Sequence, residues 1–263
     1  MLNKDIKGVP VFESEVFSEK QTKYCLCIPI INEGDRILKE LKRAQANGID
    51  KLVDIIICDG GSTDGSTDFG KLKSLGVNTL LVKKDTGKQG AQLRMGFWFA
   101  LERGYDGILT IDGNNKDSIE SVPLFIEKLE KGYDFIQGSR YVKGGEAINT
   151  PLIRSIAVKF IHSPMITLTA KHRFTDSTNA FRGYSRKYLT HPEVQPLRDI
   201  FVTYELLAYL SVKASQLGLK VCEVPVRRAY PEKGKTPTKI SFFKGNGNLL
   251  KILYNNFKGK YNP

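Results

Sequence analysis

The sequence has no long hydrophobic run and few of the residues that build disulfides or zinc sites. None of its apolar stretches approaches the roughly 18 residues that a helix needs to cross a bilayer. Residues 1–23 mix acids and lysines without the apolar centre of a signal peptide, so we expect no secretion. The 4 cysteines include no Cys-x-x-Cys pair, and the 3 histidines lack zinc-ligand spacing. We therefore expect buried, reduced thiols in a cytoplasmic protein without a histidine-based metal site.

Two common nucleotide-binding patterns are also missing. Gly87-Lys88-Gln89-Gly90 is not a Walker loop, because glutamine follows the lysine and the upstream glycine is absent. No Gly-x-Gly-x-x-Gly follows the first predicted strand, at 24–31, which disfavours a dinucleotide-dependent oxidoreductase.

Basic residues are in large excess. The formal net charge is +12, which indicates an anionic partner such as a membrane surface, a phosphorylated substrate or nucleic acid. A merely basic surface is the simpler alternative. The lysines and arginines concentrate in the second half of the chain, at 140–154, 171–173, 227–239 and 251–260. No RNA-recognition or helix-turn-helix signature accompanies them, so we do not expect a nucleic-acid partner.

Apolar segments alternate with helical patterns through the first half of the chain. Strands are predicted at 24–31, 53–58, 79–82, 107–111 and 134–137, with helices between most of them. This alternation is typical of βαβ units and predicts an α/β fold with a mainly parallel central sheet flanked by helices.

The pattern changes after Gly138. A helix is predicted at 151–170 with a break at Pro164, then a helix at 200–216 and a strand at 219–224. A basic tail helix is predicted at the C-terminus, where apolar residues recur at helical spacing: Leu249, Leu250, Leu253, Tyr254 and Phe257. Such a stripe is compatible with packing into the core and with lying on a membrane surface.

Two aspartates follow buried strands directly. Asp59 ends the run 55–58 and precedes Gly-Gly-Ser-Thr-Asp64, and Asp112 follows the strand at 107–111. The carboxyl ends of parallel strands are where open α/β sheets bind ligands. The pair therefore predicts one shared site for a nucleotide or a metal-bound phosphate, although each turn alone is also an ordinary cap or loop.

Taken in order, these segments resemble the motifs of family-2 glycosyltransferases. The matching segments, over roughly residues 23–240, are Pro29-Ile-Ile-Asn32-Glu33, Asp59-Gly-Gly-Ser62-Thr-Asp64, Gly87-Lys88-Gln89-Gly90, Asp112-Gly-Asn114, Gln137-Gly-Ser139-Arg140, Asp176-Ser-Thr-Asn-Ala-Phe181 and Glu223-Val-Pro225. The resemblance points to the branch that makes dolichol- or polyprenyl-phosphate sugars, and it implies a GT-A (Rossmann-like) fold. It divides the chain into an N-terminal extension (1–22), a GT-A domain (23–240) and an amphipathic basic tail (241–263).

The resemblance also implies roles for individual residues. The donor, a nucleoside-diphosphate sugar, would contact Pro29, Asn32, Glu33, Asp59, Ser62, Asp64, Lys88, Asp112 and Asn114. The acceptor phosphate would contact Arg140, Arg154 and Lys239. An arginine is also expected shortly after Glu223-Val-Pro225, and Arg227 and Arg228 are both candidates.

For the chemistry, Asp112 is the expected metal-bound catalytic residue. Asp112 and Asn114 would hold a divalent cation, Mg²⁺ or Mn²⁺, that neutralises the leaving diphosphate. Asp176, or else Glu205, would be the base if the acceptor is a hydroxyl. The chain departs from the family pattern at Gly60 and Asn114, where acids are usual, so metal affinity is expected to be weakened.

The sequence thus predicts an inverting glycosyltransferase that adds one sugar to a polyprenyl phosphate or a similar lipid-linked acceptor. The basic half and the tail stripe predict a peripheral protein at the inner face of the membrane. Two alternatives stay open: transfer to a sugar hydroxyl in capsule, O-antigen or cell-wall assembly, and a non-catalytic donor-binding relative.

Overall fold

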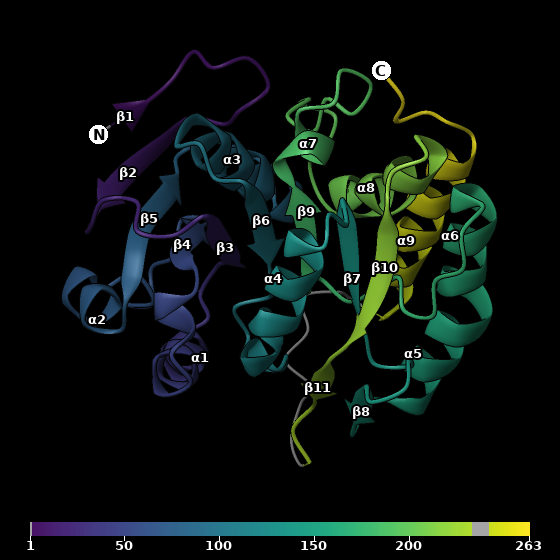
Figure 1. Cartoon of the computed structure of the whole chain (residues 1–263), viewed down its shortest axis with the longest axis horizontal. Coiled ribbons are helices and arrows are strands. Elements are labelled where there is room, and N and C mark those ends of the chain that lie inside the picture. The colour runs from purple at the N-terminus through teal and green to yellow at the C-terminus, as the bar shows by residue number, and fades with distance from the viewer. Residues whose placement is uncertain (1, 233–241) are drawn as a thin grey trace.

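A nine-stranded sheet forms the centre of the molecule (Figure 1). The computed structural model describes residues 2–232 and 242–263 of the chain, and all statements below concern those residues. The strand order is β1-β2-β5-β4-β3-β6-β9-β7-β10, and β8 and β11 pair separately. The strands are β1 (Leu2–Asn3), β2 (Phe12–Val16), β3 (Tyr24–Ile30), β4 (Asp54–Asp59), β5 (Val77–Lys83), β6 (Gly107–Thr110), β7 (Phe135–Ser139), β8 (Glu146–Ile148), β9 (Arg182–Ser185), β10 (Val221–Pro225) and β11 (Arg227–Ala229).

The middle of the sheet is parallel. β5, β4, β3 and β6 are parallel neighbours, and β7 and β10 form a further parallel pair. Between them β9 runs antiparallel to both β6 and β7. Every residue of β3 and of β4 is buried, as expected for strands covered on both faces. The predicted α/β fold with a mainly parallel sheet is therefore confirmed.

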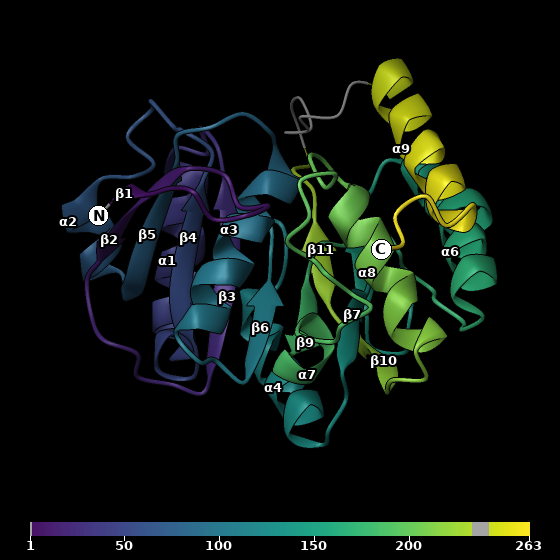
Figure 2. The same ribbon diagram turned by 90° about the horizontal axis from the view of Figure 1, so that it is seen from above.

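Helices cover both faces of the sheet (Figure 2). They are α1 (Asp35–Ala46), α2 (Phe69–Ser74), α3 (Gln89–Glu102), α4 (Val122–Glu130), α5 (Leu152–Ala157), α6 (Ser163–Ala170), α7 (Arg186–Leu189), α8 (Glu205–Gln216) and α9 (Phe242–Phe257). Alternate residues of β3 enter opposite cores: Cys25 and Cys27 pack with α3 and α8, and Leu26 and Ile28 pack with α1 and α4. This period of two is the signature of a strand between two helical layers.

The helix predicted at 151–170 is not broken by Pro164. α5 continues through a π-helical turn (Val158–His162) into α6, where the proline stands in the first turn. A first-turn proline needs no donor of its own, and the π turn takes up the change in backbone hydrogen bonding. The expectation of a break was wrong, and the result is one long helical element along the edge of the molecule (Figure 1).

Both ends of the chain pack against the central sheet or its helices. β2 from the predicted N-terminal extension pairs antiparallel with β5 and extends the sheet beyond its parallel strands. α9 lies along α6 and near α8, where the Asn256 side-chain amide donates to the carbonyl of Ala208 at 2.9 Å (Figure 2). Ile252 and Leu253 are buried on this side, while Tyr254 and Phe257 stay exposed. In the described ranges, no helix combines the length and apolarity that a membrane crossing requires.

Close packing of α3 on the sheet depends on Gly96. The three thiols of Cys25, Cys27 and Cys58 are free and buried below this helix. A β-carbon at position 96 would lie 2.6 Å from the Sγ of Cys58 and 3.2 Å from that of Cys27. Both distances are below normal contact, so only glycine lets the helix approach this closely.

We expect Gly96→Ala to lower the free energy of unfolding by about 1–2 kcal/mol, because overpacking exceeds the gain in helix propensity. Gly247 is the matched control, since a β-carbon there meets nothing within 4 Å and the residue is also helical. Urea titration of both variants checks this. A Gly96→Ala protein as stable as Gly247→Ala would contradict the packing explanation.

Candidate active site

The ends of four parallel strands meet at one edge of the sheet. Asp59 is the last residue of β4, and Asp112 follows the end of β6 by two residues. Their strands flank β3 on either side. The two predicted aspartates therefore lie at the same edge, with the loop after β3 between them.

The loops after β3 and β4 are bonded to each other. The Asn32 amide N–H donates to the Ser62 hydroxyl at 2.8 Å, and the Asn32 side-chain oxygen accepts from the Thr63 amide at 2.8 Å. The Ser66 hydroxyl accepts from the amides of Glu33 and Gly34 at 3.1 and 2.8 Å. These bonds fix the two loops as one surface.

Asp59 and Asp64 help to build this surface in different ways. Asp59 is fully buried and accepts from the Gly61 and Ser62 amides at 2.8 and 2.9 Å. Asp64 is exposed, and bonds from the Ser66 hydroxyl and backbone amides outweigh its burial and lower its pKa. Asp59 therefore orders its own loop, whereas Asp64 is open to a ligand.

The first turn of α3 connects these loops to Asp112. The Gln89 side-chain amide donates to Asp112 Oδ1 at 3.0 Å. The Gln92 amide donates to the carbonyls of Ile30 and Cys58 at 2.6 and 2.8 Å, where β3 and β4 end. Lys88 is exposed directly before this turn, and its backbone N–H donates to the carbonyl of Val202 at 3.0 Å.

Arg228 neutralises two aspartates at once. Its guanidinium donates to Asp112 Oδ2 at 3.1 Å and to Asp117 Oδ2. β11 holds it there because the Ala229 amide donates to the Lys116 carbonyl at 2.8 Å. Successive strand residues face opposite ways, so Arg228 points inward and Arg227 is exposed. Of the two arginines left open by the sequence, Arg228 is the one at the site.

Asp112 and Asp117 respond differently to this shared cation. Burial raises the pKa of Asp112, but Arg228 and Lys116 lower it by more, so the pKa lies below its usual value. Asp117 is more deeply enclosed, and burial keeps its pKa raised despite Arg228. Asp112 is thus an ionised, partly exposed carboxylate.

Three cations surround the ring of Tyr230, and we call Lys116, Arg154 and Arg228 the cationic cluster. Their charged groups lie 5.1, 5.5 and 5.8 Å from the ring centre. Arg154 also donates to the Tyr230 hydroxyl at 2.7 Å. Burial raises the pKa of Tyr230, but Arg228 and Arg154 lower it by more. The cluster is a positive region directly beside Asp112.

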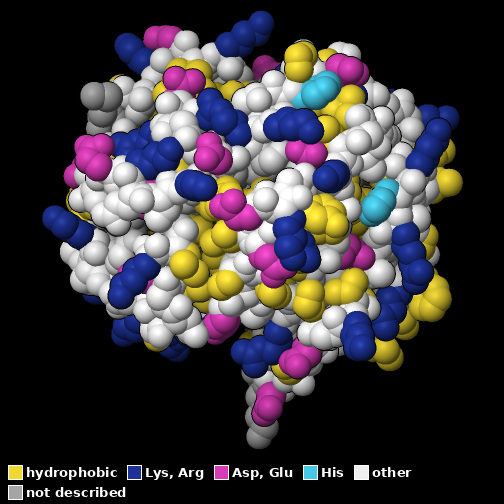
Figure 3. All heavy atoms as spheres, viewed as in Figure 1, with side chains coloured by type: hydrophobic (Ala, Val, Ile, Leu, Met, Phe, Trp, Pro, Cys, Tyr) yellow, Lys and Arg dark blue, Asp and Glu magenta, His cyan; other side chains and the backbone are white. Residues whose placement is uncertain are grey.

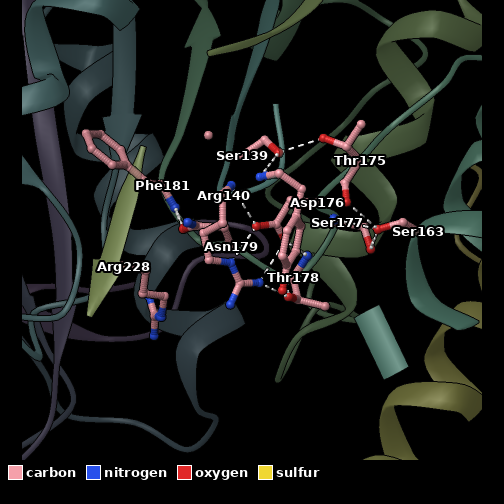
Figure 4. Close-up of polar contacts among 12 residues, drawn as sticks. Ser139, Arg140, Ser163, Thr175, Asp176, Ser177, Thr178, Asn179, Phe181 and Arg228 are labelled. Atoms are coloured by element: carbon pink, nitrogen blue, oxygen red, sulfur yellow. Dashed lines mark hydrogen bonds and ion pairs between the residues drawn. The ribbon is translucent and has the colours of Figure 1, made fainter. Parts of the chain in front are cut away.

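Arg140 and Asp176 form a buried ion pair (Figure 4). Arg140 donates from Nε to Asp176 Oδ2 at 2.6 Å and from Nη2 to Oδ1 at 2.9 Å. Glu223 fixes the same loop by accepting from the amides of Thr175 and Asp176 at 3.0 and 3.2 Å. Burial raises the pKa of Asp176, but Arg140 lowers it by more. This interior position does not favour a base role for Asp176 or an acceptor contact by Arg140, and both roles stay predictions.

The remaining predicted residues are Glu205, Pro29 and Lys239. Glu205 begins α8, where its carboxylate accepts from the Thr203 amide and, at 2.7 Å, from the Thr203 hydroxyl. It thus ties the helix start to the residue before the N-cap Tyr204. Pro29 lies inside β3, paired with Cys58. Lys239 lies outside the residues that the structure describes.

A divalent cation at this edge would have Asp112 and Asn114 as its protein ligands. One observation favours it: Asn114 Oδ1 and Asp117 Oδ1 are both buried and have no hydrogen-bond partner. Against it, both Asp112 oxygens already accept bonds, from Gln89 and Arg228. Among the described residues no three histidines, cysteines or acids are placed to hold a metal ion. The side chains therefore do not fit a cation site held by the protein alone.

Several site residues were missed from the sequence. They are Gln89, Gln92, Lys116, Asp117 and Tyr230. The two glutamines have a sequence signal, since residues three apart in the first turn of a helix share one face. The others come together because β11 lies against the loop after β6, and local sequence patterns do not encode such a long-range contact.

Comparisons with known proteins identify the family of the chain. The sequence profile of "Glycosyl transferase family 2" matches residues 25–191. An undecaprenyl-phosphate mannosyltransferase of Micrococcus luteus is 25% identical over 70% of this chain and 74% of its own length. A dolichol-phosphate mannosyltransferase of Pyrococcus furiosus is 26% identical over 82% of this chain and 59% of its own length.

Solved structures share the fold at lower identity. Glucosyl-3-phosphoglycerate synthase from Mycobacterium tuberculosis, crystallised with Mn²⁺, uridine-diphosphate and phosphoglyceric acid, superposes with a TM-score of 0.63 at 15% identity. The match covers 90% of this chain and 78% of that one. Mannosyl-3-phosphoglycerate synthase from Rubrobacter xylanophilus gives 0.64 at 14% identity, covering 90% and 73%. These likenesses confirm the GT-A fold.

We expect Arg140→Met to lower the free energy of unfolding by about 3–5 kcal/mol, because it leaves Asp176 charged and buried without its partner. Arg140→Met/Asp176→Asn should recover part of the loss. Lys131→Gln, which breaks the exposed pair with Glu127, should change little. The pKa of Asp176 is depressed, so the pair stabilises above the unfolded-state pKa of about 3.9 and loses its effect as pH falls below it.

Urea titrations at neutral and acid pH measure these differences. A double variant no more stable than Arg140→Met would show that the loss does not come from an uncompensated charge.

Proposed function

This chain belongs to glycosyl transferase family 2, and from that premise we propose that it transfers one sugar from a nucleoside-diphosphate sugar to a polyprenyl phosphate. It is a glycosyltransferase with a GT-A fold. One observation carries the proposal: the cationic cluster lies beside Asp112, at the edge where the loops after β3 and β4 are joined. This edge offers an acidic and polar surface for a nucleoside and a positive region for phosphates.

The proposed reaction inverts the anomeric carbon. An acceptor oxygen forms a bond to that carbon while the bond to the diphosphate oxygen breaks, and the diphosphate leaves with the electron pair. A phosphate monoester has a second pKa of about 6, so it attacks as an oxyanion without a general base. This agrees with the enclosed position of Asp176, which stays ionised but faces Arg140.

We assign donor contacts to the exposed parts of the joined loops. Asn32, Ser62 and Asp64 lie on their surface, with Glu33 beside them, and Lys88 stands at the start of α3. Asp59 supports these contacts indirectly, because its buried carboxylate orders the loop after β4. Arg154 and Arg228 are assigned to phosphate, since guanidinium groups bind phosphate oxygens in a planar, two-point manner.

The divalent cation expected at Asp112 and Asn114 stays a prediction. Such a cation would supply positive charge to the leaving diphosphate. We assign no step to it, because the side chains around Asp112 do not fit a protein-held cation site.

A polyprenyl-phosphate acceptor is favoured by the relatives named as mannosyltransferases to undecaprenyl and dolichol phosphate. The two solved structures of phosphoglycerate synthases favour a second candidate function, the transfer of a sugar to a hydroxyl group. A non-catalytic donor-binding protein is the third. Product analysis separates these three functions.

A membrane-facing surface supports the lipid acceptor. We call the exposed apolar side chains of the α5–α6 element the apolar face: Leu152, Ile153, Ile156, Phe160, Ile161 and Leu168. Leu152 and Phe160 are each 74% exposed, and together with their neighbours they form an apolar patch of the kind that marks a binding surface. Lysines accompany these residues along this edge (Figure 3), and residues 147–175 contain no acid. Apolar and basic groups together fit an anionic lipid surface.

We expect purified protein to transfer a sugar from one member of a nucleotide-sugar panel to undecaprenyl phosphate. Asp112→Asn should lower kcat by about 10²-fold or more, because the carboxylate that orients the phosphate-binding arginine loses its charge. Asp106→Asn is the matched control, since Asp106 is exposed at the opposite end of the same strand. Mass spectrometry of the lipid extract measures the product.

A product on a glycan hydroxyl, with none on polyprenyl phosphate, would replace the acceptor in this proposal. Nucleotide-sugar binding without any product from either acceptor would instead favour the non-catalytic relative.

We expect the protein to sediment with vesicles containing phosphatidylglycerol, increasingly with anionic content and less at high salt. Leu152→Ser/Phe160→Ser should lower the vesicle partition coefficient about tenfold or more, because two large apolar side chains no longer enter the interface. Leu52→Ser/Phe69→Ser, at exposed apolar positions outside this face, is the control. Equal recovery of the wild-type protein in the supernatant with and without vesicles would refute the membrane surface.

A further inference from the structure

Positive side chains crowd the carboxylate at which a divalent cation is expected. Asp112 is the single carboxylate of the Asp-x-Asn sequence, and Arg228 Nη2 lies 3.1 Å from its Oδ2. Lys116 follows four residues after Asp112 on the same loop and is 7% exposed. The site thus places two basic side chains around one acid.

Lys116 is fixed in this position by the second sheet. Its carbonyl accepts from the Ala229 amide at 2.8 Å, which ties its backbone to β11. Its ammonium lies 5.1 Å from the ring centre of Tyr230, the same ring that Arg154 and Arg228 approach. Burial and then Arg228 lower the pKa of Lys116, and Asp112 raises it by less. The Lys116 side chain is therefore held in place beside Asp112, against the same ring as the two arginines.

The charges of Asp112, Asp117 and the cationic cluster, taken together, have a positive sum. Asp112 and Asp117 contribute two negative charges, and Lys116, Arg154 and Arg228 contribute three positive charges, an excess of one. Burial raises the pKa of nearby Glu40 well above its usual range, which favours its neutral form. A divalent cation would have to approach against this excess, whereas a diphosphate, with about three negative charges at neutral pH, would be attracted by it.

We propose that Lys116 takes the place of the divalent cation in holding the donor diphosphate, so that this chain binds nucleoside diphosphates without metal. Arg228 shares the task and is oriented by Asp112 and Asp117. The inference rests on the proposed function, since it concerns the donor diphosphate of that transfer. It also explains why an uncharged Asn114 is sufficient next to Asp112: no cation requires a second carboxylate there.

Calorimetric titration with uridine and guanosine diphosphates tests the proposal, first in EDTA and then in MnCl₂. We expect the nucleotide that binds to do so in EDTA with an affinity within about threefold of that in Mn²⁺. Lys116→Gln should weaken binding in EDTA about tenfold, as expected for the loss of one charge-assisted contact. Mn²⁺ should restore much of that loss, because it replaces the missing positive charge.

Two further variants separate charge from packing. Lys116→Arg keeps the positive charge and should bind in EDTA like the wild type. Lys20→Gln removes an ammonium that lies at the same 5.1 Å from a tyrosine ring, that of Tyr105, away from the site, and should bind normally. Thermal unfolding midpoints of all variants verify that each is folded.

The outcomes distinguish this inference from the function on which it rests. Nucleotide binding that EDTA abolishes and Mn²⁺ restores in the wild type would overturn the role of Lys116 and leave the proposed function standing. Equal affinity of the wild type and Lys116→Gln in EDTA would overturn it as well. No nucleotide binding in either medium would overturn both.

Discussion

The site depends on the neutralisation of two acids, one buried and one partly exposed, by one guanidinium. Asp112 and Asp117 lie on the loop after β6, and Arg228 donates to both. Gln89 satisfies the second oxygen of Asp112, whereas Oδ1 of the buried Asp117 has no hydrogen-bond partner. β11 supplies Arg228 from a segment 116 residues away in sequence. The position of β11 therefore fixes the loop after β6. It also brings Arg228 to the ring of Tyr230 with Lys116 and Arg154, which forms the cationic cluster.

Two arginine–aspartate contacts at this edge have different roles. Arg140 and Asp176 are enclosed, with side chains 2% and 0% exposed, and they satisfy each other through two bonds. Asp112 keeps 23% of its side chain exposed while bonded to Arg228. The first pair fixes the loop between α6 and β9, and the second leaves a carboxylate and a cation within reach of a ligand. Sequence motifs do not tell which of the two pairs is enclosed, and the difference in burial separates their roles.

The fold and the location of the site were predictable because both depend on local patterns. Buried β-branched runs ending in Asp59 and near Asp112 indicate parallel strands, and their common edge follows from topology. The direction of each side chain was not predictable in the same way. Asp59 turns back onto its own loop. Arg140 pairs with Asp176, which lies 36 residues further along the chain. Such partners are chosen by tertiary packing, and no spacing rule in the sequence encodes them.

The α5 helix links the cationic cluster to the apolar face. Arg154 donates to Tyr230 from this helix, while Leu152 and Ile153, the two residues before it, are exposed. Residues in a helix are about 1.5 Å apart along the axis, so Arg154 lies within about 3 Å of these two residues along α5. On the proposed function, a lipid phosphate at headgroup level would meet Arg154 while its chain stays in the bilayer. The same helix would then set both the depth of the protein in the interface and the position of the acceptor.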